Sequence, residues 1–272
     1  MKFIPMGSMQ VPAIGLGTYK LTGLAAIDTF LEAFRIGYRL VDTAQLYMNE
    51  DEVGKALALS GLDRKEFIVV TKVWPTNFTS DRFIPSVKES LKKLRTDYVD
   101  LLLIHWPHPQ FKVSQYIQFL AQAKEEGFAK EIGVSNYNIE QINTAINAGI
   151  PILTNEIEFH PWINQRSIRE HMQQHNMPII AYTPLGRGMM VKDKIVADIA
   201  KEHQRMPAQI VLRWMMQQED IIAIPKATST KHLLENLNVF DFTLSTAGMS
   251  KIDSLANDNL RVVPAQPGAK WD

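Results

Sequence analysis

The sequence predicts an α/β protein: a single-domain (β/α)8 TIM barrel with a short N-terminal hairpin and two extra helices. Compact apolar runs alternate with longer amphipathic stretches, as strands alternate with helices. The runs are apolar at successive positions, which is typical of parallel strands buried on both faces. The alternation repeats eight times within 272 residues, an ordinary size for one α/β barrel.

The predicted strands are short runs bounded by turn or helix signals. They span residues 13–17, 38–42, 67–72, 99–104, 131–134, 152–157, 178–182 and 221–224. Residues 2–12 form two shorter apolar stretches around Gly7, which indicates a small hairpin ahead of the first repeating unit.

Helical periodicity fills the segments between these strands. The predicted helices span residues 24–36, 49–59, 80–94, 114–126, 139–148, 164–175, 193–203 and 230–238. Asn49 is expected to cap the second helix, and Gly37 follows the last periodic residue of the first. Two further helices, 208–217 and 245–256, do not fit the alternation and are expected to be insertions. No linker divides the chain, so residues 1–272 are expected to form one domain.

A doubly wound open sheet is the competing fold class. Such a sheet normally carries a GxGxxG fingerprint between its first strand and first helix. The segment GLGTYK at residues 15–20 lacks the third glycine and is not followed directly by a helix. The barrel is therefore the better prediction.

Composition argues against several classes of function. Lys plus Arg and Asp plus Glu number 29 each, so no excess of positive charge attracts nucleic acid. The lack of cysteine excludes disulfides, thiolate nucleophiles and Cys-ligated metals. No apolar run approaches the roughly 18 residues of a membrane span, and no signal-peptide pattern is present at the N-terminus. We expect a soluble cytoplasmic protein without nucleic-acid or membrane partners.

Three consecutive predicted strands lead to ionisable residues, namely Asp42, Lys72 and His105. In a (β/α)8 barrel the C-terminal ends of the strands share one rim, where functional groups gather. Tyr47 follows soon after Asp42 and can fold over the same rim. Each residue alone has a structural explanation, such as a helix cap for Asp42 or a satisfied core position for His105. Four at matching positions predict one catalytic site.

These residue types fit general acid catalysis. The pKa of a tyrosine is ordinarily about 10, and the Lys72 ammonium is expected to lower the pKa of Tyr47 by stabilising its phenolate. Asp42 would hold Lys72 and balance its charge, and His105 would orient a substrate oxygen. A phenol tuned in this way can protonate an oxygen that is becoming an alkoxide, as in carbonyl reduction. Since no side chain supplies a hydride, a nicotinamide cofactor is expected.

Eight motifs resemble those of the aldo-keto reductase family and follow the family's order. They are GLGTY at 15–19, DTAQLYMNE at 42–50, TKVW at 71–74, LLLIHWP at 101–107, IGVSN at 132–136, TNEIEFHP at 154–161, AYTPLG at 181–186 and IPKATS at 224–229. The chain looks most similar to bacterial 2,5-diketo-D-gluconate reductases of the B type, which also reduce methylglyoxal. The resemblance implies an NADPH-dependent reductase in which Asp42, Tyr47, Lys72 and His105 are catalytic and Tyr47 is the acid.

The resemblance also implies which residues bind the cofactor. Around the nicotinamide and its carboxamide it places Gly17, Thr18, Asp42, Ser135, Asn136, Glu156 and Tyr182. At the pyrophosphate and adenosine end it places Leu185, Gly186, Lys226, Thr228, Ser229, His232 and Asn236.

Three positions depart from the family pattern. Glu156 stands where the family usually has Gln, and a carboxylate accepts hydrogen bonds but cannot donate them. His232 replaces an Arg that usually holds the 2′-phosphate, and Ala227 replaces a common Ser. Losing a permanently charged guanidinium weakens discrimination between the cofactors, while Lys226 still favours NADPH. We expect a preference for NADPH with some use of NADH.

Aromatic side chains near the predicted rim suit a small carbonyl substrate. They are Tyr19, Trp74 and Trp106. The loops after the fourth and seventh strands and the tail from residue 257 are short, which indicates an open pocket. Arg187, Arg261 and Lys270 could meet a substrate carboxylate only if their loops close over the site. We therefore expect reduction of aldehydes and methylglyoxal before diketo sugar acids, by a monomer.

Other readings make different predictions. A nicotinamide-binding redox-sensing module would bind cofactor with little turnover. A lyase or isomerase would use Lys72 as a Schiff base. A metal enzyme is disfavoured because the histidines do not form a recognisable ligand cluster, and we expect no metal.

Overall fold

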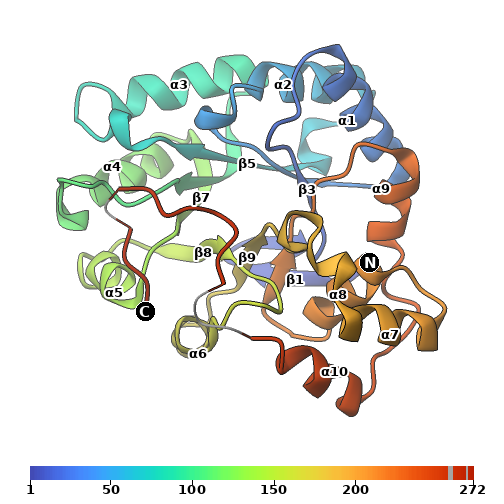
Figure 1. Ribbon diagram of the computed structural model, residues 1–272. Coiled ribbons are helices and arrows are strands. Elements are labelled where there is room, and N and C mark those ends of the chain that lie inside the picture. Colours follow the sequence, from blue (N-terminus) through green and yellow to red (C-terminus); the bar gives the residue numbers. More distant parts are fainter. Residues whose placement is uncertain (257–259, 268) are drawn as a thin grey trace.

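The computed structural model describes residues 1–256, 260–267 and 269–272. Eight parallel strands follow one another around a barrel, each hydrogen-bonded to its neighbour in sequence (Figure 1). A parallel bridge between Ile14 and Ala223 closes the ring, and the Gly15 N–H donates to the Ala223 carbonyl at 2.8 Å. Closure in sequence order confirms the predicted (β/α)8 barrel and excludes the open sheet.

The barrel strands coincide closely with the predicted runs. They are β3 (Leu16–Gly17), β4 (Leu40–Asp42), β5 (Ile68–Val73), β6 (Val99–Ile104), β7 (Ala129–Ser135), β8 (Ile152–Glu158), β9 (Ile179–Tyr182) and β10 (Ile221–Ala223). Every residue of β6 is buried, as expected for a parallel strand covered by helices outside and by core side chains inside.

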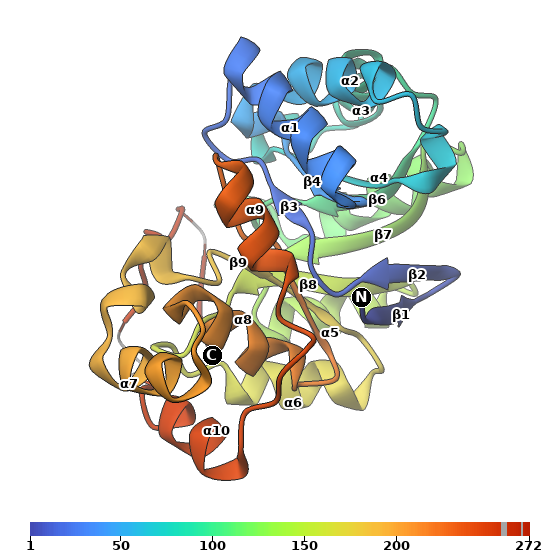
Figure 2. The ribbon, with the colours of Figure 1, turned by 90° about the vertical axis from the view of Figure 1, so that its right-hand side faces the viewer.

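The predicted hairpin precedes the barrel. Strands β1 (Phe3–Met6) and β2 (Met9–Pro12) pair antiparallel, with Gly7 in the left-handed region at the turn. The Ser8 N–H and hydroxyl donate to Glu131 near the start of β7, at 3.1 and 2.8 Å. Figure 2 shows the hairpin beside β7 and β8. It therefore covers the N-terminal end of the barrel, away from the strand ends that carry the predicted catalytic residues.

Helices surround the strands on the outside. Those of the repeating units are α1 (Leu24–Ile36), α2 (Glu50–Leu59), α3 (Phe83–Leu94), α4 (Val113–Glu125), α5 (Ile139–Asn147), α6 (Arg166–Gln174), α7 (Lys194–His203) and α9 (Thr230–Leu237). The two predicted extra helices are also present, as α8 (Pro207–Met216) and α10 (Thr246–Asp253). Within the described ranges, the search for a helix long and apolar enough to cross a bilayer finds none.

Asn49 departs from its predicted role as a helix cap. It stands at the start of α2, but its side chain makes no capping hydrogen bond. The Thr43 hydroxyl instead donates to its Oδ1 at 2.7 Å, and its Nδ2 donates to the carbonyls of Thr18 and Leu21 at 2.9 and 2.7 Å. A fully buried amide must find partners for both ends, and these loop groups supply them. Asn49 thus ties the loop after β3 to the loop after β4.

Candidate active site

The four predicted catalytic residues lie together at the C-terminal ends of three neighbouring strands. Asp42 ends β4, Lys72 is next to last in β5, and His105 directly follows β6. Tyr47 ends the short 3-10 helix η1 (Gln45–Tyr47) in the loop after β4. Parallel register brings these residues to one rim, because Asp42 pairs with Val70 of β5, and Lys72 pairs with Leu103 of β6, two residues before His105.

Lys72 is the centre of the cluster and is completely buried. Its Nζ lies 2.6 Å from Asp42 Oδ1, 3.0 Å from the Thr43 carbonyl and 3.3 Å from Glu156 Oε1. Burial opposes the charged form, but the carboxyl groups of Asp42 and Glu156 outweigh it and raise the pKa of Lys72. The side chain is therefore a permanent cation. A Schiff-base lysine needs a neutral amine, so this geometry disfavours the lyase reading.

Tyr47 packs against the cation. The Lys72 Nζ lies 5.1 Å from the centroid of its ring. Burial raises the pKa of Tyr47, and Lys72 offsets only part of that effect. The expected net lowering is thus wrong for the protein without ligands, because desolvation of the phenolate outweighs the ammonium. Tyr47 is a neutral phenol that keeps its proton at neutral pH.

His105 lies opposite the phenol as a neutral imidazole. Its ring centroid is 5.5 Å from that of Tyr47 and 5.2 Å from that of Trp74. Burial, reinforced by the Lys72 charge, lowers the pKa of His105 well below its ordinary value. A neutral ring has one N–H donor, which suits the orientation of a carbonyl oxygen without competing for the proton.

Glu156 belongs to this cluster more directly than the sequence indicated. The resemblance assigns it to a carboxamide, whereas its Oε1 contacts Lys72 and its carboxyl group is within hydrogen-bond reach of Asp42. Burial first, and then the Asp42 charge, raise the pKa of Glu156 well above its ordinary value. The carboxyl residue at a position where the resemblance expects Gln was the available signal, but its partner could not be read from the sequence.

The predicted nicotinamide-side residues form one hydrogen-bonded network beside these groups. Ser135 ends β7 and donates to the Glu156 carbonyl at 2.8 Å. Asn136 Nδ2 donates to the His105 carbonyl at 3.0 Å, and Asn136 Oδ1 accepts from the Tyr182 hydroxyl at 2.6 Å. Asn136 has a φ of 61°, in the left-handed region, so this network fixes a strained residue in place.

Gly17 and Thr18 close the same rim at the seam of the barrel. A Cβ on Gly17 would lie 2.5 Å from the Ile224 carbonyl oxygen, so only glycine allows this approach of the two chain segments. The Thr18 hydroxyl donates to the Asp42 carbonyl at 2.8 Å. Both residues therefore lie next to the catalytic cluster.

The residues predicted for the pyrophosphate and adenosine lie farther around the rim and range from exposed to buried. Leu185 and Gly186 are at the 3-10 helix η4 (Gly186–Gly188). Around the start of α9 the exposed side chains are Lys226, Thr228 and His232. Ser229 caps α9 by accepting from the His232 N–H at 3.3 Å. Asn236, like Gly186, is buried, and it lies on the same helix as Leu233, whose carbonyl accepts from the Tyr38 hydroxyl at 2.9 Å.

Two of the three aromatic residues predicted to line the pocket, Tyr19 and Trp74, contact the Lys72 cluster through Tyr47 and His105, and Trp106 contacts the C-terminal tail. Tyr19 packs on Tyr47 with ring centroids 5.0 Å apart. Trp271 lies against Trp106 at 6.0 Å, and the Arg261 guanidinium stacks 3.7 Å above the Trp271 ring. Figure 1 shows the tail crossing from α10 toward α4 and α5. The expectation of an open pocket rested on a brief tail, and this tail instead packs on Trp106.

Specific hydrogen bonds hold that tail. Glu158, the last residue of β8, accepts from the Val262 N–H at 2.7 Å and from His160 at 2.9 Å. Asp272 accepts from the Ile139 N–H at the start of α5 at 2.9 Å. Sequence reasoning missed these contacts because an irregular segment carries no periodicity from which its path could be predicted.

Gln45 is a further residue that the sequence reading left without a role. Its Oε1 accepts from the Trp74 N–H at 3.0 Å and from Asn77 at 2.9 Å, and its Nε2 donates to the Ser86 carbonyl at 3.2 Å. Gln45 thus fixes the loop that carries Trp74 against His105. Its place two residues before Tyr47, inside the DTAQLYMNE motif, was the available signal.

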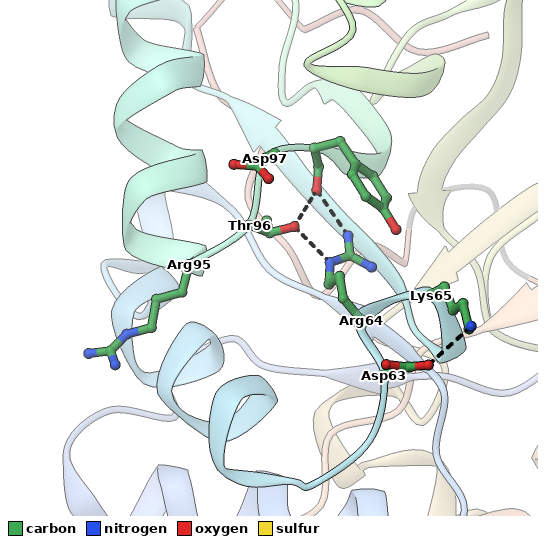
Figure 3. Close-up of a pocket in the computed structure, with 7 residues that line it drawn as sticks. Asp63, Arg64, Lys65, Arg95, Thr96 and Asp97 are labelled. Atoms are coloured by element: carbon green, nitrogen blue, oxygen red, sulfur yellow. Dashed lines mark hydrogen bonds and ion pairs between the residues drawn. The ribbon is translucent and has the colours of Figure 1, made fainter.

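A second hollow, of about 370 Å³, lies at the opposite end of the barrel, near the starts of β5 and β6 (Figure 3). Arg64 crosses it and donates to Thr96 Oγ1 at 2.9 Å and to the Tyr98 carbonyl at 3.0 Å. It also pairs with Asp100 at 2.8 Å. These bonds occupy the guanidinium, so this hollow is a structural clasp between two loops and is no candidate for the active site.

The cluster fits a nicotinamide cofactor better than a metal ion. The amide of Asn136 donates to the Ser135 hydroxyl and to the His105 carbonyl, and glycine at position 17 leaves the rim free of a side chain. Glu156 Oε2 is buried without a hydrogen-bond partner among the described residues. In the part of the chain that the structure describes, no group of three or more His, Cys, Asp or Glu residues could hold a metal.

Comparison with known proteins agrees with this geometry. Residues 13–257 match the Aldo/keto reductase family. The chain is 41% identical over 268 residues to the methylglyoxal reductase DkgB of Escherichia coli O157:H7, covering 97% of this chain and 100% of the relative. It is 34% identical over 258 residues to the glyoxal reductase of Bacillus subtilis strain 168, covering 94% and 92%.

Solved structures give the same result. A protein provisionally named 2,5-diketo-D-gluconic acid reductase B superposes with a TM-score of 0.97 at 37% identity, covering 100% of this chain and 98% of that one. The aldose reductase of Schistosoma japonicum gives a TM-score of 0.90 at 30% identity, covering 96% and 94%. The resemblance seen in the motifs is thereby confirmed, and this chain belongs to the aldo/keto reductase family.

Proposed function

We propose that this protein catalyses the NADPH-dependent reduction of small aldehydes and ketones to alcohols. Methylglyoxal and aromatic aldehydes are the expected substrates, with 2,5-diketo-D-gluconate as a weaker one. One observation carries the proposal: a neutral phenol, Tyr47, lies beside a buried permanent cation, Lys72, and faces a neutral imidazole, His105. That arrangement suits the donation of a proton to a developing alkoxide.

Each residue of the cluster then has a definite task. The His105 N–H donates a hydrogen bond to the substrate carbonyl oxygen and orients it. Tyr47 transfers its phenolic proton to that oxygen, and the Lys72 ammonium stabilises the tyrosinate that remains. Asp42, at 2.6 Å, keeps Lys72 charged and in place. The nicotinamide supplies the hydride when bound, and Ser135, Asn136 and Tyr182 would hold its ring and carboxamide.

The cofactor preference rests on the exposed residues around the start of α9. Lys226 supplies a positive charge for a 2′-phosphate, and Thr228 and Ser229 add hydroxyl groups near it. His232 is also exposed and lacks the permanent fork of an arginine. We therefore propose NADPH as the preferred cofactor and NADH as a weaker alternative.

We further propose that the protein acts as a monomer built as a single barrel domain over residues 1–272. The names of the relatives, methylglyoxal reductase and glyoxal reductase, support small dicarbonyl substrates. Oxidation of NADPH by purified protein with methylglyoxal or an aromatic aldehyde tests the proposal. A rate no faster than the rate without substrate would disprove it, while tight cofactor binding without turnover would favour a redox-sensing module.

A further inference from the structure

The catalytic lysine has two carboxyl partners where one would balance it. Asp42 comes from β4 and Glu156 from β8, and the exposed fractions are 1% for each and 0% for Lys72. If both acids were ionised, the group would carry a net negative charge out of contact with water. Such a buried, uncompensated charge is strongly unfavourable, so a proton should be retained in the cluster.

The distances indicate which acid retains that proton. Asp42 Oδ1 approaches the Lys72 ammonium to 2.6 Å, the length of a charge-assisted bond, whereas Glu156 Oε1 remains at 3.3 Å. The two carboxyl groups are within hydrogen-bond reach of each other. Their other oxygens, Asp42 Oδ2 and Glu156 Oε2, are buried and have no further partner among the described residues. A proton on Glu156 that is donated to Asp42 would give both of these oxygens a hydrogen-bond partner.

We propose that Glu156 is a positioning residue that remains protonated during reduction and donates its proton to Asp42, so that Lys72 faces Tyr47 with a single ionised partner. This inference rests on the proposed function, because it concerns the charge that Tyr47 experiences as it gives up its own proton. The Glu156 proton itself is not consumed. The proton that moves goes from the Tyr47 oxygen to the substrate oxygen.

The groups around Glu156 determine how its charge affects proton transfer from Tyr47. The charges of Asp42 on β4 and Lys72 on β5 shift the pKa of Glu156 in opposite directions. A charge on Glu156 would in turn raise the pKa of Tyr47 on η1 and of Tyr182 on β9. His105, on the far side of Lys72, is neutral because burial lowers its pKa. Lys72 is thus the cation that contacts both acids. An ionised Glu156 would add a second negative charge beside the tyrosinate and oppose the proton transfer.

The sign of the pH dependence follows. Burial raises the pKa of Glu156, so the neutral form is present at lower pH and is lost as pH rises through that value. Above it, the wild-type kcat should fall about tenfold per pH unit. Glu156→Gln keeps the shape of the side chain but cannot ionise. Its kcat should lack the alkaline decline until Tyr47 itself titrates, whatever its value at low pH.

A matched control is Glu50→Gln. Glu50 is also a buried carboxyl group with a raised pKa, but it bonds the Thr71 hydroxyl at 2.6 Å outside the cluster. This variant should retain the alkaline decline. If Glu156→Gln also retains it unchanged, the inference is overturned.

An infrared measurement separates this inference from the proposed reaction, since it needs neither cofactor nor substrate. The difference spectrum of wild type minus Glu156→Gln should contain the carbonyl stretch of a protonated carboxylic acid at neutral pH. That band should vanish as pH rises. Its absence at neutral pH would overturn the inference whether or not the protein reduces aldehydes. If Glu156→Gln does not fold, the band can be titrated in the wild type and in Glu50→Gln instead. A band that is present in both proteins and vanishes at the same pH does not come from Glu50, and its absence from both would overturn the inference.

Discussion

The two sides of the barrel rim are built differently. On the side of β4, β5, β6 and β8, the chemical groups are buried and hold one another at ion-pair and hydrogen-bond distances around Lys72. On the side of α9 and the tail, single exposed side chains such as Lys226 and His232 are carried on loops and at the first turn of a helix. Substitutions on the first side should damage chemistry and stability together, and those on the second should adjust binding alone.

The largest effect is expected for Lys72→Met. Removing the ammonium leaves two buried carboxyl groups without their cation, and breaking a buried pair in this way costs about 3–5 kcal/mol of unfolding free energy. Because the acids then favour their protonated forms in the folded state, the variant should regain stability as pH falls. Urea unfolding at acid and alkaline pH measures this.

Adding Glu156→Gln to Lys72→Met should restore part of the lost stability at alkaline pH, because Glu156 can then no longer ionise in the unfolded chain and favour unfolding. A Lys72→Met protein as stable as the wild type at alkaline pH would show that the buried side of the rim does not depend on its ion pairs.

Tyr47→Phe should have the next largest effect. Loss of the proton donor is expected to reduce kcat on the order of 10²-fold or more, while NADPH affinity stays nearly unchanged. Steady-state rates with methylglyoxal and fluorescence titration with NADPH measure the two quantities. Near-normal kcat would remove Tyr47 from its assigned role and would erase the difference in chemistry between the two sides.

His232→Arg probes the exposed side. A permanently charged fork near the start of α9 should raise the ratio of kcat/KM for NADPH over NADH by about 1 kcal/mol, or roughly fivefold. Lys231→Arg, one position earlier, keeps the charge of an exposed side chain that pairs with Glu235 and serves as the control. An equal change in both variants would mean that a guanidinium anywhere at the start of α9, rather than at position 232, sets the preference.

The smallest effect is expected at the tail. Trp271→Ala removes the ring that packs on Trp106 and under Arg261. An aromatic contact of this kind is worth about 0.5–1.5 kcal/mol, so KM for an aromatic aldehyde should rise several-fold with kcat little changed. A fall in kcat without a change in KM would mean that the tail contributes to the chemical step. The two sides would then not be divided into one for chemistry and one for binding.

The sequence by itself predicted the barrel, the order and bounds of its strands, and the meeting of Asp42, Tyr47, Lys72 and His105 at one rim. These features depend on local periodicity and on the fact that parallel strand ends in a barrel share a rim. The family motifs also pointed correctly to the aldo/keto reductases.

Only the tertiary structure decided the rest. Glu156 contacts Lys72. Asn49 is not a helix cap, and its buried side chain hydrogen-bonds the loop after β3. The tail is held to the end of β8 by the hydrogen bond from the Val262 N–H to Glu158. Burial raises the pKa of Tyr47, which the sequence reading expected to be lowered. Each of these depends on which groups from distant segments meet and on how much water they exclude. Neither quantity is encoded in the local pattern of residues.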